Sequence, residues 1–175
     1  MGAISAARPL ALGVATGMRS QLGLAALAVA MRKGPRDVNM VVGRQVLASP
    51  VLKQTLIATA AGELVADKLP ATPSRLNRGP LLARLALGGA AGAVLGYAEK
   101  RSVVAAVTGA ALGVAGAGIG AYGGYHLRAA LDRHTDIPDR YWAVAEDATA
   151  IGLAAFAVAT GAHTDGQAEP EPEEA

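Results

Sequence analysis

The residues with the clearest chemical meaning in this sequence are charged side chains placed inside apolar runs. Arg19 lies near the middle of the apolar run Pro9–Met31, and Glu63 lies inside the run Ser49–Leu69. Asp67 follows Glu63 by four residues, so the two carboxylates share one face of a helix. A charge at the bilayer centre costs at least about 2.5–3.5 kcal/mol on insertion scales, so such residues usually face the inside of a bundle and pair. These side chains therefore indicate a polar centre.

A second acidic pair lies in the last apolar run, Tyr141–Thr160. Glu146 and Asp147 are adjacent there, so on a helix their side chains point about 100° apart and face different partners. The sequence predicts that Arg19 pairs with Glu63 or with Glu146 inside the bundle, and it leaves both partners open. Such a pair either fixes helix packing alone, or belongs to a pathway for an ion, proton or solute, or to an enzyme or lipid site.

The composition excludes most classes of soluble protein. The chain has 175 residues, of which 52% are hydrophobic and 17% charged, with no cysteine. Low charge and high hydrophobicity exclude a disordered chain, and the missing cysteines exclude a disulfide scaffold and a thiolate zinc site. The formal net charge is only +2. The basic residues of the chain lie in short clusters between apolar runs, and this spacing favours contact with an anionic lipid surface over binding of nucleic acid.

The elements that must position the polar centre are membrane helices. About 20 apolar residues cross a bilayer as a helix, and five segments approach this length, of which the third is interrupted near its start by Arg84. The five segments are Pro9–Met31, Ser49–Leu69, Gly79–Tyr97, Ser102–Leu127 and Tyr141–Thr160. We therefore expect an all-α polytopic membrane bundle of about five transmembrane helices, multi-pass in the cell membrane, with the lipid bilayer as its partner. Residues 1–163 form its single domain, and residues 164–175, proline-broken and acidic, form a disordered tail.

Glycines recur every fourth residue in the third and fourth segments, which places them on single helix faces. They are Gly88, Gly92, Gly96, Gly109, Gly113, Gly116, Gly120 and Gly124. Small residues let helix backbones approach closely in lipid, where apolar surface gives no drive between helices. We therefore expect these two segments to pack as a Gly-rich helical hairpin, and the same stripes are candidates for contact between copies in a homo-oligomer.

Other chemistry has less support in the sequence. Lys68, Arg75 and Arg78 could contact an anionic headgroup. The sequence has no cysteine and no pair of histidines at HxxxH spacing, so neither a metal site nor a cofactor is expected. No nucleophile has an evident base nearby, so an enzyme is not the favoured interpretation.

Four stretches together resemble a known family. They are Gly17-Met18-Arg19-Ser20, the run from Glu63 through Asp67-Lys68-Leu69-Pro70 to Pro73 and Arg75, the Gly-rich hairpin, and Ala145-Glu146-Asp147. Over about Leu10 to Ala159 the chain resembles the DUF4126 family, and the stretch from Asp67 to Arg75 is the most specific part. The resemblance implies a small bacterial membrane protein of unknown function and a set of polar positions, and it implies no reaction.

Three functions follow as expectations. The first is a transporter or channel for a small solute, ion or proton, working through the Arg/Glu polar centre. The alternative is a structural or assembly protein packed through its glycine stripes. The third is a protein or enzyme that handles a phosphorylated lipid, with Arg19, Lys68, Arg75 and Arg78 as phosphate contacts and Glu63 or Asp67 as base.

Overall fold

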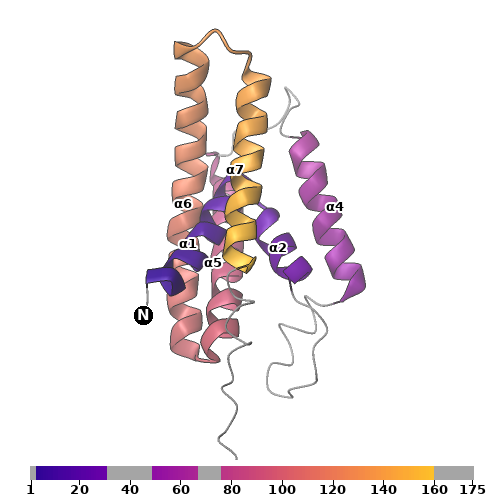
Figure 1. Cartoon of the computed structure of the whole chain (residues 1–175), viewed down its shortest axis with the longest axis vertical. Helices are drawn as coiled ribbons and strands as arrows, with labels where there is room; N and C mark the ends of the chain where they lie inside the picture. Colours follow the sequence, from indigo (N-terminus) through magenta and orange to yellow (C-terminus); the bar gives the residue numbers. More distant parts are fainter. Residues whose placement is uncertain (1–2, 31–48, 67–75, 160–175) are drawn as a thin grey trace, which may run out of the picture.

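The computed structural model describes residues 3–30, 49–66 and 76–159. Within these ranges the regular structure is entirely helical. The helices are α1 (Ala3–Met18), α2 (Leu22–Ala30), α4 (Pro50–Ala66), α5 (Arg78–Lys100), α6 (Val103–His134) and α7 (Asp139–Ala159). Figure 1 shows α6 and α7 side by side along the long axis, with α4 on the far side of α2. The expected all-α class is confirmed for this part of the chain.

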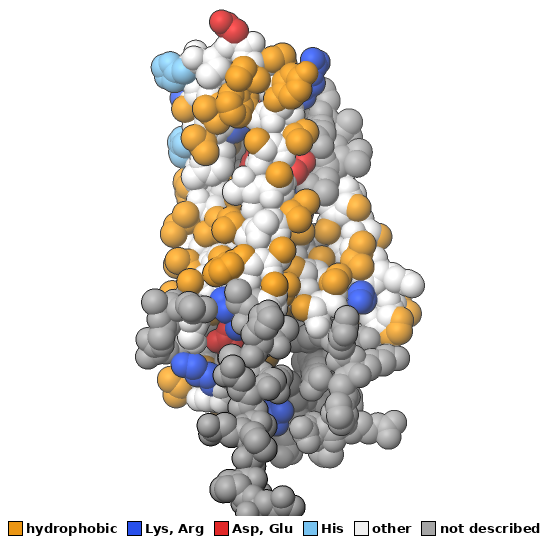
Figure 2. Space-filling model, viewed as in Figure 1, with side chains coloured by type: hydrophobic (Ala, Val, Ile, Leu, Met, Phe, Trp, Pro, Cys, Tyr) orange, Lys and Arg blue, Asp and Glu red, His pale blue; other side chains and the backbone are white. Residues whose placement is uncertain are grey.

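Among the described helices, three are long and apolar enough to cross a membrane, namely α5, α6 and α7. Their outer faces carry large exposed apolar side chains, among them Leu82, Val107 and Ile151. Figure 2 shows such side chains spread over α6 and α7. Apolar surface of this extent is unfavourable in water and favourable against lipid, so the chain has the character of a membrane protein.

Glycine contacts join α5 to α6. The two helices are connected by a short turn in which Arg101 adopts the left-handed conformation (φ 47°) and donates its N–H to the Tyr97 carbonyl at 2.7 Å. A Cβ atom on Gly92 would lie 2.1 Å from the Gly109 carbonyl oxygen, and one on Gly113 would lie 2.1 Å from that of Gly88. No side chain fits in such a gap, so the two backbones are in direct contact.

A second glycine face of α6 receives α1. A Cβ on Gly116 would lie 2.3 Å from the Leu10 carbonyl oxygen, and one on Gly120 would lie 2.1 Å from that of Val14. From the other side, a Cβ on Gly17 would meet the Ala117 carbonyl oxygen at 2.1 Å. Gly124, further along α6, is half-buried. Because α1 also packs against α5 and α7, it is the central helix of the bundle.

The first apolar run does not form the single span expected for Pro9–Met31. It forms α1 and α2, which meet at a turn over residues 19–21. A Cβ on Gly23 would lie 2.1 Å from the Thr16 hydroxyl oxygen, and Leu27 joins the same apolar cluster as Leu12. The chain therefore turns back on itself, as Figure 1 shows, and we call α1, the turn and α2 the re-entrant hairpin. At the break, the backbone N–H groups of residues 20 and 21 donate to the distant Glu63 side chain instead of continuing the helix.

The run Ser49–Leu69 corresponds to α4. Leu56 of α4 packs against Ala25 and Ala28 of α2. With 17 residues α4 is about 26 Å long, which is shorter than the roughly 30 Å hydrocarbon core. Three of the five expected spans therefore have helices of membrane-crossing length. The expected tail, residues 164–175, lies outside the described residues.

Candidate functional site

The turn of the re-entrant hairpin holds a carboxylate from another helix. Glu63 of α4 accepts hydrogen bonds from the backbone N–H of Ser20 at 2.8 Å and of Gln21 at 3.1 Å. These N–H groups stand at the start of α2, where a helix leaves its first donors unsatisfied and carries partial positive charge. A carboxylate is a favourable acceptor there, so Glu63 stabilises the break between α1 and α2.

The same carboxylate binds a buried arginine of α5. Arg84 donates from Nη1 to Glu63 Oε1 at 3.0 Å, and the two side chains are 7% and 13% exposed. The Arg84 Nε atom is fully buried and has no hydrogen-bond partner within the described part of the chain. Glu63 therefore neutralises Arg84 while Arg84 keeps one donor unused.

Arg19, at the turn itself, is paired with α7. Its Nε donates to Asp147 Oδ1 at 2.7 Å, and its Nη2 lies 2.5 Å from the same oxygen. The Arg19 residue is 2% exposed. Asp147 stands eight residues into α7, about 12 Å from its start, so the pair lies in the middle part of a membrane-length helix. We call Arg19, Glu63, Arg84 and Asp147 the central cluster.

The other acid of the α7 pair faces a different cation. Glu146 is 8% exposed, and its Oε2 lies 3.7 Å from Nη1 of Arg128 on α6. Arg128 also binds Asp139 through two hydrogen bonds of 2.7 and 2.5 Å, at the start of α7. Glu146 thus connects the middle of α7 to the α6–α7 end of the bundle. The expectation that adjacent acids face different partners agrees with this geometry.

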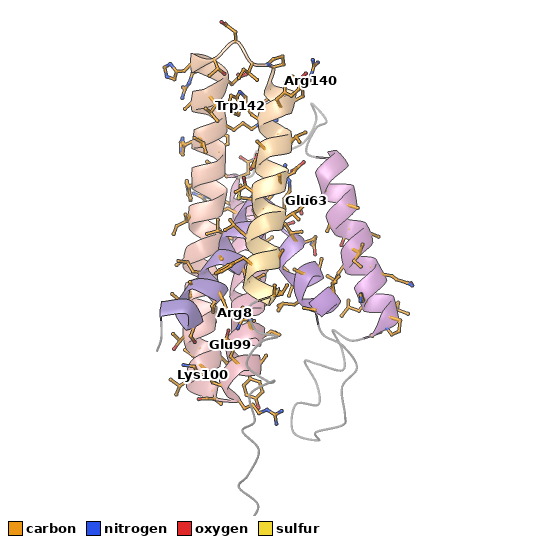
Figure 3. All side chains as sticks on the ribbon, viewed as in Figure 1. Arg8, Glu63, Glu99, Lys100, Arg140 and Trp142 are labelled. Atoms are coloured by element: carbon orange, nitrogen blue, oxygen red, sulfur yellow. The ribbon has the colours of Figure 1, made fainter. Side chains whose placement is uncertain are left out.

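A second buried group of charges lies at the opposite end of the bundle. Arg8 of α1 forms an ion pair with Glu99 of α5, and Ser5 donates to the same carboxylate at 3.2 Å. Arg8 Nε also donates to the Ala157 carbonyl oxygen at 2.8 Å, in the last turn of α7 where carbonyls lack helical partners. We call Ser5, Arg8, Glu99 and this carbonyl the end cluster. Figure 3 shows Arg8 and Glu99 together at one end and Arg140 and Trp142 at the other.

Of the five residues expected in the polar centre, Arg19, Glu63 and Asp147 belong to the central cluster, and Glu146 lies next to Asp147 and approaches Arg128. Glu63, one expected partner of Arg19, binds Arg84 instead, because the turn places the backbone of residues 20 and 21 against its carboxylate. Arg19 pairs with Asp147, the chain neighbour of the other expected partner, Glu146. Asp67, Lys68 and Arg75 lie outside the described residues, and Arg78 is exposed at the start of α5.

Sequence reasoning missed the roles of Arg84, Arg8 and Glu99. Arg84 was visible as a charge inside an apolar run, the same signal that marked Arg19. Arg8 and Glu99 stand at the edges of their runs, where a charge normally reaches the membrane interface. Nothing in the spacing distinguishes them from such interfacial residues, so only the tertiary structure shows that they pair.

A family model matches most of the chain, including these polar positions. The family model described as "Domain of unknown function (DUF4126)" matches residues 7–161. The chain belongs to the DUF4126 family. The DUF4126 match includes every member of the central cluster and both ion-pairing residues of the end cluster, and it confirms the resemblance expected from the sequence. Comparison with curated proteins and with solved structures gives no match.

The central cluster of this DUF4126 chain offers charged and hydrogen-bonding groups. Within the described residues no group of three His, Cys, Asp or Glu side chains is placed to hold a metal ion. The central cluster instead combines carboxylates, which can carry a proton, with guanidinium groups and backbone N–H groups, which bind anions. Such a set of groups suits binding or passing a small charged species.

Proposed function

We propose that this protein crosses the cell membrane several times and transports or conducts a small ion, a proton or a small solute through the central cluster. Ionisable residues inside membrane segments are costly and usually mark ion or proton pathways. Arg19 and Arg84 are both buried, and each has a carboxylate partner from another helix. Two such pairs at one place favour a functional centre over a single packing contact.

The observation that carries the proposal is the interruption of the first apolar run at residues 19–21, beside these charges. Irregular backbone at membrane depth is tolerated only where protein buries it or where it lines a water-filled cavity. Transporters bind their substrates at such discontinuous helices, whose freed N–H and carbonyl groups contact the substrate. The re-entrant hairpin has this geometry, with Glu63 bound to its freed N–H groups.

The assembly alternative loses its main motivation in this geometry. Gly116 and Gly120 contact α1, and Gly92 and Gly113 contact the opposite helix of the α5–α6 pair. These faces are filled within one chain and are not available to a partner.

For the phosphorylated-lipid alternative, two of its expected basic contacts lie outside the described residues, and no specific observation favours it.

Ion flux across proteoliposomes tests the proposal. Purified protein is reconstituted into vesicles that hold an indicator for the species under test, and gradients of protons, sodium, chloride and small solutes are applied one at a time. We expect flux above that of protein-free vesicles for at least one ion, reduced at least tenfold by Asp147→Asn. The matched control is Asp132→Asn, an exposed acid near the end of α6, which leaves flux unchanged.

Thermal unfolding of each variant in detergent separates loss of transport from loss of fold. If Asp147→Asn does not fold, Glu146→Gln takes its place in the same assay. No flux for any of these ions or solutes, or equal flux in the centre and control variants, overturns the proposal.

A further inference from the structure

We infer that the central cluster is reached from the α6–α7 end of the bundle, and that an apolar barrier around Leu12 closes the way from there to the end cluster. The inference rests on the proposed function and deepens it, because it gives the transported species a route and a gate. It starts from the seam between α1 and α7. Each end of this seam has a buried arginine of the re-entrant hairpin bound to α7, Arg8 in the end cluster and Arg19 in the central cluster.

A row of charged side chains leads from the start of α7 to the central cluster. Asp139 binds Arg128, and Arg128 approaches Glu146, whose chain neighbour Asp147 binds Arg19. Side-chain exposure falls from 49% at Asp139 and 23% at Arg128 to 6% at Glu146, 13% at Asp147 and 2% at Arg19. Since Asp139 is the first residue of α7, the row begins at the end of a membrane-length helix and leads about 12 Å inward.

Beyond the central cluster the same seam is apolar. Leu12 of α1 is fully buried in one cluster with Leu27 of α2, Leu95 of α5 and Ala154 of α7. Thr16, one helical turn from Leu12, is also fully buried, and its hydroxyl donates to the Leu12 carbonyl oxygen at 2.8 Å within its own helix. Four helices therefore close the seam at this level with apolar side chains, and we call Leu12, Leu27, Leu95 and Ala154 the barrier.

The barrier separates the two charged clusters. Ala157, whose carbonyl binds Arg8, follows Asp147 by ten residues, which is about 15 Å of helix. Figure 3 shows Arg8 and Glu99 at the opposite end of the bundle from Arg140, which belongs to the first turn of α7. The two clusters therefore belong to opposite sides of the membrane.

Buried charges on both sides of an apolar barrier form the arrangement of a closed pathway. Hydrophobic constrictions gate ion pathways by excluding water. Helix packing alone gives no reason for charges at both places, because apolar side chains of similar volume stabilise a buried contact as well or better. The structure therefore represents a state open toward the α6–α7 end and closed at the barrier.

Sided cysteine labelling tests the route, because the chain has no cysteine of its own. Ser20→Cys reports on the central cluster and Ser5→Cys on the end cluster, and each replaces a partly exposed serine with a residue of similar size. A charged, membrane-impermeant methanethiosulfonate is added to right-side-out and to inverted membranes of an expression host. We expect Ser20→Cys to react at least tenfold faster from the side that labels Asp136→Cys, in the turn between α6 and α7, and Ser5→Cys from the opposite side.

Leu12→Asn in the Ser20→Cys background tests the barrier. An amide at this level admits water, so we expect Ser20→Cys to react at least tenfold faster from the far side, and flux in proteoliposomes to rise at least tenfold. A residue with a packing role alone would lose stability without any gain in flux. The matched control is Leu82→Asn, at an exposed leucine of α5, which leaves both rates unchanged.

Thermal unfolding in detergent shows whether each variant folds. If Leu12→Asn does not fold, Leu12→Ala takes its place, since it removes volume from the barrier, and Leu82→Ala becomes the control. Unchanged labelling and flux in the Leu12 variant that folds overturns the barrier. A Ser20→Cys protein that reacts from neither side, from both sides, or from the side of Ser5→Cys overturns the route.

These outcomes are distinguishable from failure of the proposed function. Sided labelling that Leu12→Asn abolishes, with no flux in the wild type, retains the route and the barrier and removes transport. Flux in a protein whose Ser20→Cys thiol reacts equally from both sides retains transport and removes this inference.

Discussion

Arg8 on α1 and Arg19 in the turn that follows α1 bind the same helix, α7. Arg8 donates to the Ala157 carbonyl oxygen at 2.8 Å, and Arg19 donates to the Asp147 carboxylate at 2.7 Å. The partners run in the opposite order along α7, so α1 and α7 are antiparallel and fastened near both ends of α1. Because α1 also fills the second glycine face of α6, it holds the bundle together from its centre.

The pair of Arg19 and Asp147 should behave as a coupled unit in stability measurements. Arg19→Gln leaves the carboxylate buried, and Asp147→Asn leaves the guanidinium buried, so each should lower the free energy of unfolding by about 3 kcal/mol. The double variant leaves neither charge, and its loss should be smaller than the sum by about 1–3 kcal/mol. Unfolding of the four proteins in mixed detergent micelles, followed by circular dichroism, measures this coupling.

Additive losses in this double-mutant cycle would mean that the two side chains do not interact. Arg19→Gln combined with Asp132→Asn serves as a control, because Asp132 is exposed. That combination should be additive within about 0.5 kcal/mol, as distant sites normally are.

The glycines of α6 should differ sharply in their tolerance of a methyl group. Gly113→Ala would place a Cβ 2.1 Å from the Gly88 carbonyl oxygen, so the helices must separate, at a cost of about 1–3 kcal/mol or more. At Gly123 an added Cβ has no atom within 4 Å among the described residues. Gly123→Ala should be neutral or stabilise by up to about 1 kcal/mol through helix propensity. Equal melting temperatures for the two variants would contradict backbone contact between α5 and α6.

Burial should decide which ion pairs matter for stability. The side chains of Arg8 and Glu99 are 9% and 16% exposed, whereas those of Arg128 and Asp139 are 23% and 49% exposed. Glu99→Gln should therefore cost about 2 kcal/mol, as expected for a buried charge-assisted hydrogen bond. Asp139→Asn should cost less than about 1 kcal/mol, because solvent screens the pair. Thermal unfolding at low and high salt compares them, and a larger loss for Asp139→Asn would reverse this assignment.

Cysteine labelling can locate the lipid-facing surface, because the chain has no cysteine of its own. Single substitutions are Ile119→Cys, on the exposed apolar face of α6, and Asp136→Cys, in the turn between α6 and α7. In vesicles a membrane-impermeant maleimide should label Asp136→Cys at least tenfold faster, because a thiolate is disfavoured in lipid. Similar rates at both positions would mean that this face of α6 is exposed to water.

The sequence predicts those parts of the fold that depend on length and apolar content. The runs Gly79–Tyr97, Ser102–Leu127 and Tyr141–Thr160 correspond to α5, α6 and α7 within a few residues at most ends. The end of α6 is the exception, because the helix continues to His134. A charge such as Arg128 does not stop a helix, although it does limit how much of that helix can lie in hydrocarbon.

The remaining features depend on contacts that no local pattern contains. The re-entrant hairpin forms because Glu63, more than 40 residues away, takes the N–H groups of Ser20 and Gln21. The Glu63 carboxylate also forms an ion pair with Arg84, and Arg19 forms an ion pair with Asp147. Spacing within one helix can show that two acids face apart, but it cannot show which helix each will meet.

The central place of α1 has a consequence for how the protein is made. Of the described helices, α1 leaves the ribosome first, yet Glu99 follows Arg8 by 91 residues and Asp147 follows Arg19 by 128. A nascent re-entrant hairpin entering the bilayer alone would carry two guanidinium groups without their counter-charges, each at a cost of several kcal/mol. We therefore expect the re-entrant hairpin to reach its final place in the bundle only after α7 has been synthesised.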